Sequence, residues 1–565
     1  MNRLLFFLHR WLGVGLAVFM LLWFLSGLVI VYSSYMYQNR AMQLAHAEPL
    51  RLESGWLGFG AAWAQSAGER AARDANAEAR SGRGRAARNN REGAEGRRSE
   101  RQGGEQSAET AIVEARLLRQ GGEPVWLAED ARGRQYALSA VDGHLWQVSA
   151  DDALKIAVGW LERENRAEAA SSLQYRESVE KPAILRGQEA LSPFHRVALQ
   201  DGWGGELLIS ATSGEVVHVS NRLERASYWV GNWLHMFRFL DLAGWGEART
   251  DVLFWAITLS LLASLTGLIV GWLRWRPGWF GKPTYNQGRT QPYRLFWFRW
   301  HFWAGLIGGI VATLWALSGV LSSLQSSLFS PATPNREAVQ QYYGVGIPAA
   351  LRDWQPALSI SEAAEVVQLG WRRLGDEAVL LAHKADGERI LVESSPLSED
   401  ALNAAVARLT QTDANVEKTV DVLHEYDAYY YPRHRRGAYD RPLPAWRFQL
   451  ADSAGTHVYL DPLDGRLLLR DDRSRRQYRW LFSALHHWDL PVLYQRPLWD
   501  VWMLAWIALG LVLSVSSVVL GVKRLRVTLR RREAKAERKP KAAPAAVPPQ
   551  EEAPTPVLAI EETHP

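Results

Sequence analysis

Residues 9–27 read HRWLGVGLAVFMLLWFLSG, and residues 301–319 read HFWAGLIGGIVATLWALSG. Five positions match at one constant offset: His9, Gly13, Trp23, Ser26 and Gly27 correspond to His301, Gly305, Trp315, Ser318 and Gly319. Matches that include a histidine and a tryptophan indicate an internal duplication. Both stretches are long and apolar, so the sequence predicts a membrane protein built from two copies of one plan.

Four apolar runs are long enough to cross a bilayer, which needs about 20 residues. We expect membrane spans over residues 4–31, 252–272, 295–324 and 501–522. The first run is too long for the apolar region of a signal peptide, and no A-x-A-like cleavage site follows it, so we expect it to be retained. Many Trp residues lie near the ends of these runs, as in the aromatic belts of membrane proteins.

Clusters of Lys and Arg follow the second and fourth runs, beginning at Arg274 and Lys523. Because such clusters mark the cytoplasmic side, we expect a multi-pass protein of the bacterial inner (plasma) membrane with both termini in the cytoplasm. The expected parts are a first span at 1–34, an outer segment at 35–227, an outer-face His segment with the second span at 228–273, a cytoplasmic loop at 274–294, a third span at 295–326, an outer segment at 327–477, an outer-face His segment with the fourth span at 478–522, and a basic tail at 523–565.

Each copy consists of a span, an outer domain and a second span. Both copies start on the same side, so the repeats are parallel, and a pseudo-two-fold axis along the membrane normal should relate them. Near the second and fourth spans, Trp229, Leu234 and His235 correspond to Trp480, Leu485 and His486. The predicted fold is therefore a mainly α membrane protein with a four-helix transmembrane bundle and outer α+β modules.

The outer segments contain both foldable and unfoldable stretches. Residues 66–110 have no aromatic residue and are rich in Arg, Glu, Gly and Ser, so we expect a disordered insertion there and a disordered tail from about residue 533. Apolar spacing predicts helices at 149–162 and 359–374. Turn signals at 212–214 and 464–465 predict antiparallel strand pairs around them. A helix packed on a small antiparallel sheet is expected in each outer segment.

The chain has no Cys. This absence excludes disulfides, Cys-ligated iron–sulfur clusters and covalent c-type haem attachment through C-x-x-C-H. The cytoplasmic segments contain no dinucleotide-binding fingerprint. Any redox cofactor must therefore be held by His, Met, Tyr or carboxylate side chains, and an NADH or flavin donor would act through a partner.

Five histidines, His9, His235, His301, His486 and His487, lie in membrane segments or at their ends, where an ionisable group is costly and suggests function. On the predicted axis, His9 would face His301 near the inner surface, and His235 would face His486 near the outer surface. Six-coordinate haem iron takes two imidazoles from opposite sides. The pattern therefore predicts two b-type haem sites, roughly 20–25 Å apart at 1.5 Å per helical residue.

Several alternatives stay open for these residues. For a single histidine, interfacial packing beside Trp would suffice, and zinc is disfavoured because no further ligands accompany either pair. His487, whose counterpart is Met236, could be an alternative ligand, a residue supporting the ligand or a residue near the substrate. The membrane glycines could admit a flat macrocycle or a closely packed helix; they are Gly13, Gly15, Gly305, Gly308 and Gly309.

With these residues in view, the chain resembles the PepSY-associated transmembrane family, also called iron-regulated membrane proteins. The resemblance rests on residues 9–13, their echo at 300–305, the Leu-Trp…Leu-Ser-Gly pattern at 22–27 and 314–319, and Leu485-His486-His487. The strand–turn–strand at 458–465 resembles the end of a PepSY module. The first copy departs from the family's Leu-His-His pattern, because it reads Leu234-His235-Met236.

Members of that family include siderophore reductases of the inner membrane. The resemblance implies PepSY-like modules in both outer segments and two haem b groups, held by His, that carry electrons to a ferric chelate (a siderophore) in the periplasm. Reduction to Fe(II) would release the iron. The expected partners are membrane lipid, the ferric chelate and an electron donor that is either quinol or a cytoplasmic reductase; no nucleic acid is expected.

A loop in the second outer segment could form a substrate mouth that cradles an anionic or aromatic chelate. Its candidate residues are Tyr426, Tyr429, Tyr430, Tyr431, Arg433, His434 and Arg435. An ordinary exposed loop is the alternative. For the whole chain, the alternatives to a haem-containing oxidoreductase are a non-catalytic PepSY scaffold or protease regulator, and a transporter component for iron chelates. Four spans without broken helices or buried charges disfavour the transporter.

Overall fold

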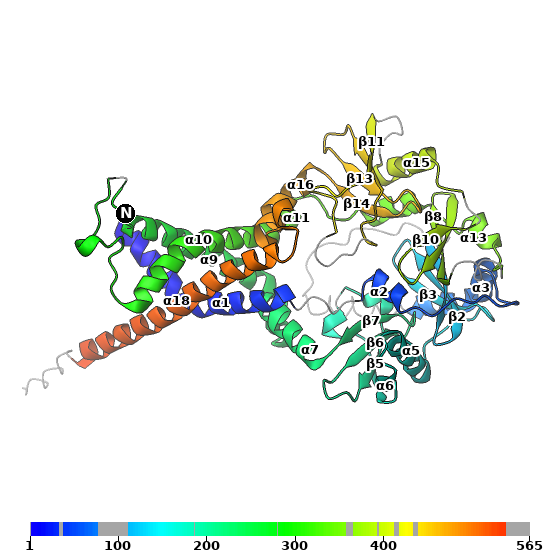
Figure 1. Cartoon of the computed structure of the whole chain (residues 1–565), viewed down its shortest axis with the longest axis horizontal. Coiled ribbons are helices and arrows are strands. Elements are labelled where there is room, and N and C mark those ends of the chain that lie inside the picture. The colour runs from blue at the N-terminus through cyan, green and yellow to red at the C-terminus, as the bar shows by residue number, and fades with distance from the viewer. Residues whose placement is uncertain are drawn as a thin grey trace, which may run out of the picture.

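A bundle of four long helices lies at one end of the molecule and a domain of three β-sheets at the other (Figure 1). The computed structural model describes residues 2–32, 38–76, 111–185, 187–279, 281–357, 365–392, 395–411, 417–432 and 439–537. The N-terminus and the far end of the last helix point away from the sheets (Figure 1). The two halves of the chain thus start and finish at the same end of the bundle.

The bundle consists of α1 (Asn2–Tyr32), α9 (Arg249–Arg274), α10 (Phe296–Ser323) and α18 (Leu498–Glu537). All four are long and apolar enough to cross a membrane, which confirms the four predicted spans. α1 and α10 each pack against both α9 and α18, so α1 and α10 lie diagonally opposite each other. α18 continues well past the predicted end of its span, through a stretch rich in the good helix formers Arg, Lys, Glu and Ala.

The membrane glycines differ in their surroundings. In α10, Gly308 and Gly309 lie against Leu509 of α18 and Leu268 of α9, where an added Cβ would sit 3.1 and 3.2 Å from the leucine side chains. These glycines allow close helix packing. In α1, nothing lies within 4 Å of a Cβ built at Gly13 or Gly15, so this stretch of α1 has open space beside it.

Two four-stranded antiparallel sheets form the modules nearest the bundle. The first contains β4 (Leu173–Val179), β5 (Phe194–Leu199), β6 (Glu206–Ser210) and β7 (Val216–Ser220), with α5 (Ala150–Arg163) packed on it. The second contains β11 (Lys418–Leu423), β12 (Ala445–Leu450), β13 (His457–Leu460) and β14 (Leu467–Asp471), with α15 (Glu399–Thr410) packed on it. Both strand-pair predictions are confirmed, as is the helix at 149–162, whose Ser149 forms a capping box with Asp152.

The third sheet is shared between the two outer segments. Its strand order is β10-β9-β8-β1-β2-β3. The first outer segment supplies β1 (Ile112–Gln120), β2 (Glu123–Asp130) and β3 (Gln135–Ser139), and the second supplies β8 (Val366–Leu374), β9 (Glu377–Lys384) and β10 (Arg389–Leu391). In the antiparallel pairing of β1 with β8, Arg116 lies opposite Gly370. These two residues occupy the same position in the repeat, so the pseudo-two-fold axis passes between them.

Two sequence predictions are corrected here. The helix predicted over 359–374 is wrong, since Val366–Leu374 is the central strand β8, while 358–364 lie outside the described residues. Both faces of β8 are buried, and apolar spacing cannot separate such a strand from a helix.

The insertion predicted to be disordered at 66–110 begins too early, because residues 67–76 are helical. Arg70 there stacks over the Trp63 ring at 3.4 Å; residues 77–110 lie outside the described part.

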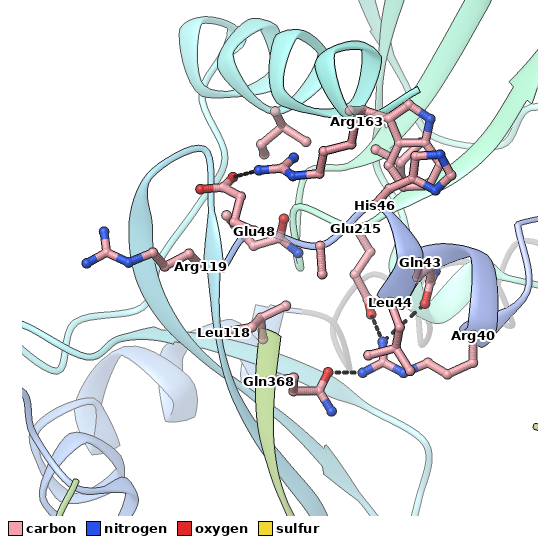
Figure 2. A pocket seen from close by; sticks show the side chains of 15 residues that line it. Arg40, Gln43, Leu44, His46, Glu48, Leu118, Arg119, Arg163, Glu215 and Gln368 are labelled. Atoms are coloured by element: carbon pink, nitrogen blue, oxygen red, sulfur yellow. Dashed lines mark hydrogen bonds and ion pairs between the residues drawn. The ribbon is translucent and has the colours of Figure 1, made fainter. Parts of the chain in front are cut away.

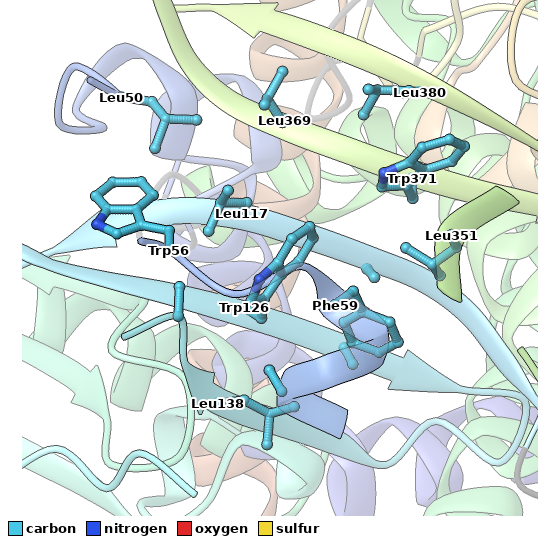
Figure 3. Close-up of a cluster of buried hydrophobic side chains, with 14 of the residues drawn as sticks. Leu50, Trp56, Phe59, Leu117, Trp126, Leu138, Leu351, Leu369, Trp371 and Leu380 are labelled. Carbon is cyan, nitrogen blue, oxygen red and sulfur yellow. The ribbon is translucent and has the colours of Figure 1, made fainter. Parts of the chain in front are cut away.

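One face of the shared sheet carries a large apolar core, drawn in Figure 3. Phe59 of α3 (Phe59–Gln65) and Leu351 of α13 (Ala349–Asp353) pack there with residues from both triplets of strands, among them Trp126 and Trp371. Because this core takes side chains from both outer segments, neither triplet of strands buries its apolar face alone. The sheet therefore joins the two halves of the chain.

The opposite face of the shared sheet carries paired charges. Arg116 donates to Glu215 at 2.8 Å, and Glu215 follows the β6–β7 turn of the first module. Arg40 of α2 (Arg40–Ala45) also contacts Glu215, and Figure 2 shows its guanidinium between Glu215 and Gln368. Arg372 pairs with Glu114 at 2.8 Å and with Asp464, in the β13–β14 turn of the second module, at 3.4 Å. Each module is thus tied to the shared sheet through one hairpin turn.

This network predicts a pH dependence of folding stability. Burial alone would raise the pKa of Glu114, but Arg372, Arg116 and Arg40 outweigh burial and lower that pKa from 4.5 to about 2. A pKa depressed in the folded state contributes stability above the unfolded value of 4.5, and this contribution is lost as the pH falls from 4.5 towards 2. Its size is on the order of 3 kcal/mol. We expect unfolding of the detergent-purified protein, followed by Trp fluorescence, to ease over this range.

The substitution Glu114→Gln should lower stability at pH 7 and flatten the pH dependence below 4.5. Glu388→Gln is the matched control, because Glu388 pairs with Lys384 on the exposed surface. An equal pH slope in the wild type and in Glu114→Gln would contradict the assignment.

Candidate functional site: two facing histidine pairs

The inner pair joins the two diagonal helices of the bundle. His9 of α1 and His301 of α10 face each other with ring centroids 6.2 Å apart. Both lie between one and two turns from the N-terminal end of their helix, at the end of the bundle that is far from the sheets. The duplicated sequence therefore places equivalent imidazoles at equal depth on opposite helices.

The outer pair lies at the sheet end of the bundle. His235 and His486 have ring centroids 6.5 Å apart. Each is carried on a short segment that leads from an outer module into the next span, and each lies beside a serine of a diagonal helix: Ser26 of α1 for His235, and Ser318 of α10 for His486. Trp23 holds the first segment further, because its indole N–H donates to the His235 carbonyl at 2.9 Å.

An unusual backbone presents both outer histidines. A π-helical turn precedes each one, η3 (Trp229–Leu234) before His235 and η5 (Arg479–Ala484) before His486. Two residues after each histidine the chain turns left-handed at a bulky residue, with φ of 52° at both Phe237 and Trp488. π-helical turns and strained backbone of this kind cluster at functional sites. The sequence shows neither feature, and their occurrence in both copies points to these two histidines.

Hydrogen bonds at Nδ1 are consistent with one tautomer in all four rings. The Nδ1 atoms of His235 and His486 lie 3.2 and 3.0 Å from the Oγ atoms of Ser26 and Ser318, and each serine donates its own hydroxyl proton to a main-chain carbonyl. The Nδ1 of His9 lies 3.2 Å from the Ala263 carbonyl oxygen. The Ala263 carbonyl oxygen can only accept, so the Nδ1 of His9 carries the proton and donates it. A serine hydroxyl can donate or accept; when its own proton goes to the main-chain carbonyl, its oxygen accepts from the histidine Nδ1 in the same way.

The inner ring on α10 follows the same rule. The Nδ1 of His301 lies 3.3 Å from Ser516 Oγ and 3.4 Å from Ser517 Oγ, and both serines donate to the Leu513 carbonyl. Among the described residues, none is hydrogen-bonded to the Nε2 of any of the four histidines. A neutral imidazole with its Nδ1–H held and its Nε2 lone pair available is the form that ligates metals.

The spacing within each pair fits one metal between two rings. Metal–imidazole bonds are about 2.0–2.1 Å long and the ring centre lies about 1.1 Å beyond the nitrogen, so two imidazoles on opposite sides of one metal have centroids about 6.3 Å apart. The observed values are 6.2 and 6.5 Å. Within the described ranges, no group of three or more His, Cys, Asp or Glu side chains could hold a metal ion. Each facing pair thus presents two imidazole nitrogens, so any metal between them would need its remaining ligands from a bound group such as a macrocycle.

His487 and Met236, the two alternatives weighed for the outer site, lie elsewhere. The His487 ring is exposed and packs against His486 and Phe482, with centroids 5.2 Å from each. The Met236 side chain is also exposed. His486 therefore faces His235, whereas His487 lies behind it on the outer side.

The loop proposed as a substrate mouth divides into buried and exposed residues. Tyr430 and Tyr431 are buried within the second module; Tyr430 stacks on Tyr459, and the Tyr431 hydroxyl donates to Asp489. Tyr426 and Tyr429 lie nearer the surface, and the Trp480 indole N–H donates to the Tyr429 hydroxyl at 3.2 Å. Arg433, His434 and Arg435 lie outside the described residues.

A buried network that the sequence reading missed supports the His486 segment. The Arg479 guanidinium donates to the carbonyl of Ala428, the carbonyl of Asp489 and the hydroxyl of Tyr494. Tyr494 in turn stacks on Tyr431 with centroids 4.6 Å apart. The network links the segment after His486 to the Tyr-rich loop. Its counterpart position in the first copy is Tyr228, so the repeat comparison gave no signal for it.

Residues 6–366 match the family described as PepSY-associated TM region. The matched stretch contains the first, second and third spans, the first outer segment and three of the four facing histidines. A search of curated proteins finds no match.

The glycine beside His9 gives a test of the inner geometry. A Cβ at Gly267 of α9 would lie 2.7 Å from His9 Cε1, whereas a Cβ at Gly27 would lie 3.8 Å from His235 Cε1, an ordinary contact. We expect Gly267→Ala to displace His9 and lower the inner site's haem occupancy several-fold, and Gly27→Ala to leave both sites occupied. Haem per chain, measured by pyridine haemochrome, checks both variants. Equal occupancy in the two would contradict the placement of His9.

Proposed function

We propose that this chain, which belongs to the PepSY-associated TM region family, binds two b-type haems and carries electrons across the bacterial inner membrane to a ferric chelate of the siderophore type. The observation that supports this most directly is the geometry of the four histidines. Two facing pairs have ring centroids 6.2 and 6.5 Å apart, with each Nδ1–H committed to the protein. Haem b needs no Cys, and the chain has none.

In this proposal, His9 and His301 hold the inner haem, and His235 and His486 hold the outer one. A bis-histidine haem supplies a one-electron Fe(III)/Fe(II) couple. The helices supply an apolar surrounding and fix the ring orientation through the Nδ1 hydrogen bonds. In this proposal the His9 end of the bundle lies in the cytoplasm and the sheets lie in the periplasm, the orientation that the basic loop and tail favour.

The proposed reaction balances with a two-electron donor at the cytoplasmic side. A quinol, or a reductase that draws on reduced flavin or NADH, gives up two electrons and its protons. Two ferric chelates on the outer side each take up one electron. Fe(II) is a softer and less highly charged ion than Fe(III), so hard oxygen ligands hold it more weakly and the chelator releases it.

The first experiment is an absorption spectrum of the detergent-purified protein, oxidised and dithionite-reduced, with a haemochrome count. We expect about two haems b per chain with low-spin bands. The anaerobically reduced protein should then be reoxidised when a ferric hydroxamate or catecholate is added, with Fe(II) trapped by a ferrous chelator. Protein without haem, after expression with an adequate haem supply, would reject the proposal and leave the non-catalytic PepSY scaffold as the better account.

Single histidine substitutions should separate the two sites. We expect His301→Ala to remove the inner haem and keep the outer one, and His486→Ala to do the reverse. His487→Ala is the matched control, because its ring lies beside His486 without facing His235. Haem count and reduced-minus-oxidised spectra measure all three. Loss of the outer haem in His487→Ala, with retention in His486→Ala, would reverse the ligand assignment.

A further inference from the structure

Three of the four facing histidines have a serine hydroxyl as a hydrogen-bond partner at Nδ1, and a helix carbonyl also lies near each ring: Trp23 for His235, Leu513 for His301 and Trp315 for His486. Their Nδ1–H groups end on serine hydroxyls: Ser26 for His235, Ser318 for His486, and Ser516 with Ser517 for His301. Ser26, Ser318 and Ser516 are fully buried, so these contacts are shielded from water. A serine layer therefore lies between the imidazoles and the helix backbone.

Each of these serines donates its hydroxyl proton to a main-chain carbonyl. Ser26 donates to the Trp23 carbonyl at 3.0 Å, and Ser318 donates to the Trp315 carbonyl at 2.9 Å. Ser516 and Ser517 both donate to the Leu513 carbonyl at 2.8 Å. Each hydroxyl thus donates to the main-chain carbonyl, and its oxygen, rather than the carbonyl oxygen, accepts from the imidazole.

His9 is the exception, and the repeat gives the reason. The stretches 260–271, SLLASLTGLIVG, and 510–521, GLVLSVSSVVLG, align without a gap and place Gly267 opposite Ser517 and Ala263 opposite Leu513. Because Gly267 has no side chain, the His9 ring lies close to the α9 backbone and its Nδ1–H reaches the Ala263 carbonyl directly. The first copy therefore lacks the Ser517 hydroxyl at the inner site. Its counterpart of Ser516 is Thr266, whose hydroxyl donates to the same Ala263 carbonyl that accepts from His9.

The acceptor on Nδ1 controls how strongly an imidazole donates to a metal. A stronger acceptor makes the ring more basic, which favours the ferric state and lowers the reduction potential. An amide carbonyl is a stronger acceptor than an alcohol hydroxyl. Serine at Nδ1 therefore keeps the ligand less basic than direct contact with the carbonyl would.

We infer that Ser26 and Ser318 tune the outer haem, holding its reduction potential above the value that direct carbonyl contact would give. This inference rests on the proposed function, since it concerns the haem held by His235 and His486. Both outer ligands end on serine, whereas one inner ligand ends on a carbonyl. The hydrogen bonds by themselves thus bias an electron towards the outer site, the direction that reduction of an external chelate requires.

The test substitutes the serine and measures the two midpoint potentials by spectroelectrochemical titration of the haem-loaded protein. Ser318→Ala removes the hydroxyl that donates to the Trp315 carbonyl. That carbonyl lies near His486 and should then accept the Nδ1–H of His486. We expect the outer midpoint to fall and the inner one to stay. A tenfold shift of the electron equilibrium towards the inner haem corresponds to 59 mV for a one-electron couple. Ser26→Ala should act in the same direction on the outer haem.

Two variants serve as controls. Ser318→Thr keeps the hydroxyl and should retain the wild-type midpoint. Ser323→Ala removes a hydroxyl of the same helix that donates to the Gly319 carbonyl at 3.1 Å and has no histidine partner, so it should change neither midpoint. These variants separate loss of the acceptor from a general disturbance of α10.

The outcomes distinguish this inference from the proposed function. Wild-type protein without haem rejects both. Two low-spin haems in the wild type, with an outer midpoint in Ser318→Ala that is unchanged or raised, reject the serine tuning and leave the electron-transfer function standing. A selective fall of the outer midpoint, restored in Ser318→Thr, supports the inference.

Discussion

The four facing histidines share one hydrogen-bonding arrangement, in which Nδ1 contacts a protein oxygen. Each of the four facing imidazoles gives its Nδ1–H to a protein oxygen, and inside a membrane no bulk water can substitute for that oxygen. The diagonal helices must therefore place Ser26 and Ser318 beside the outer rings, while α9 and α18 must bring the Ala263 carbonyl and two serines to the inner rings. Close packing at Gly308 and Gly309 follows from the same need, since α9 and α18 must approach α10 for these contacts to form. The hydrogen-bonded rings thus link all four helices to one another or to the segments that enter them.

The duplication meets this need with one design used twice. The axis that relates the two histidines of each pair also relates the two triplets of strands, where Arg116 of β1 lies opposite Gly370 of β8. The shared sheet joins the two halves far from the membrane, and the paired charges at Glu215 and Asp464 attach each module to it. From each module the chain returns to the bundle through a π-helical turn that carries an outer histidine. A rigid outer domain therefore positions the outer pair, whereas the membrane helices alone position the inner pair.

Sequence reasoning succeeded where a signal was strong and local. Apolar run length gave the four spans, and five repeated positions gave the duplication, because bilayer thickness and the duplication itself leave direct marks on the sequence. It failed at β8, where burial of both faces removes the alternation that distinguishes a strand. It gave no hint of the shared sheet, since pairing between distant strands leaves no local pattern. The repeat had marked Ser26 and Ser318, but their role emerged only once the folded chain placed them beside His235 and His486.

The differences between the two copies affect the histidine pairs as much as the similarity between the copies does. Two identical halves would give both histidines of a facing pair the same hydrogen-bonding environment, and the axis would favour neither of them. Gly267 opposite Ser517 breaks that equality at the inner site, and Met236 opposite His487 breaks it at the outer surface. Arg479 opposite Tyr228 adds a buried network behind only one of the two outer histidines. Symmetry brings the imidazoles face to face, and local departures from symmetry then make the two histidines within a pair unlike. Under the proposed function, these departures add to the difference between the inner and outer sites, which would favour electron transfer in one direction.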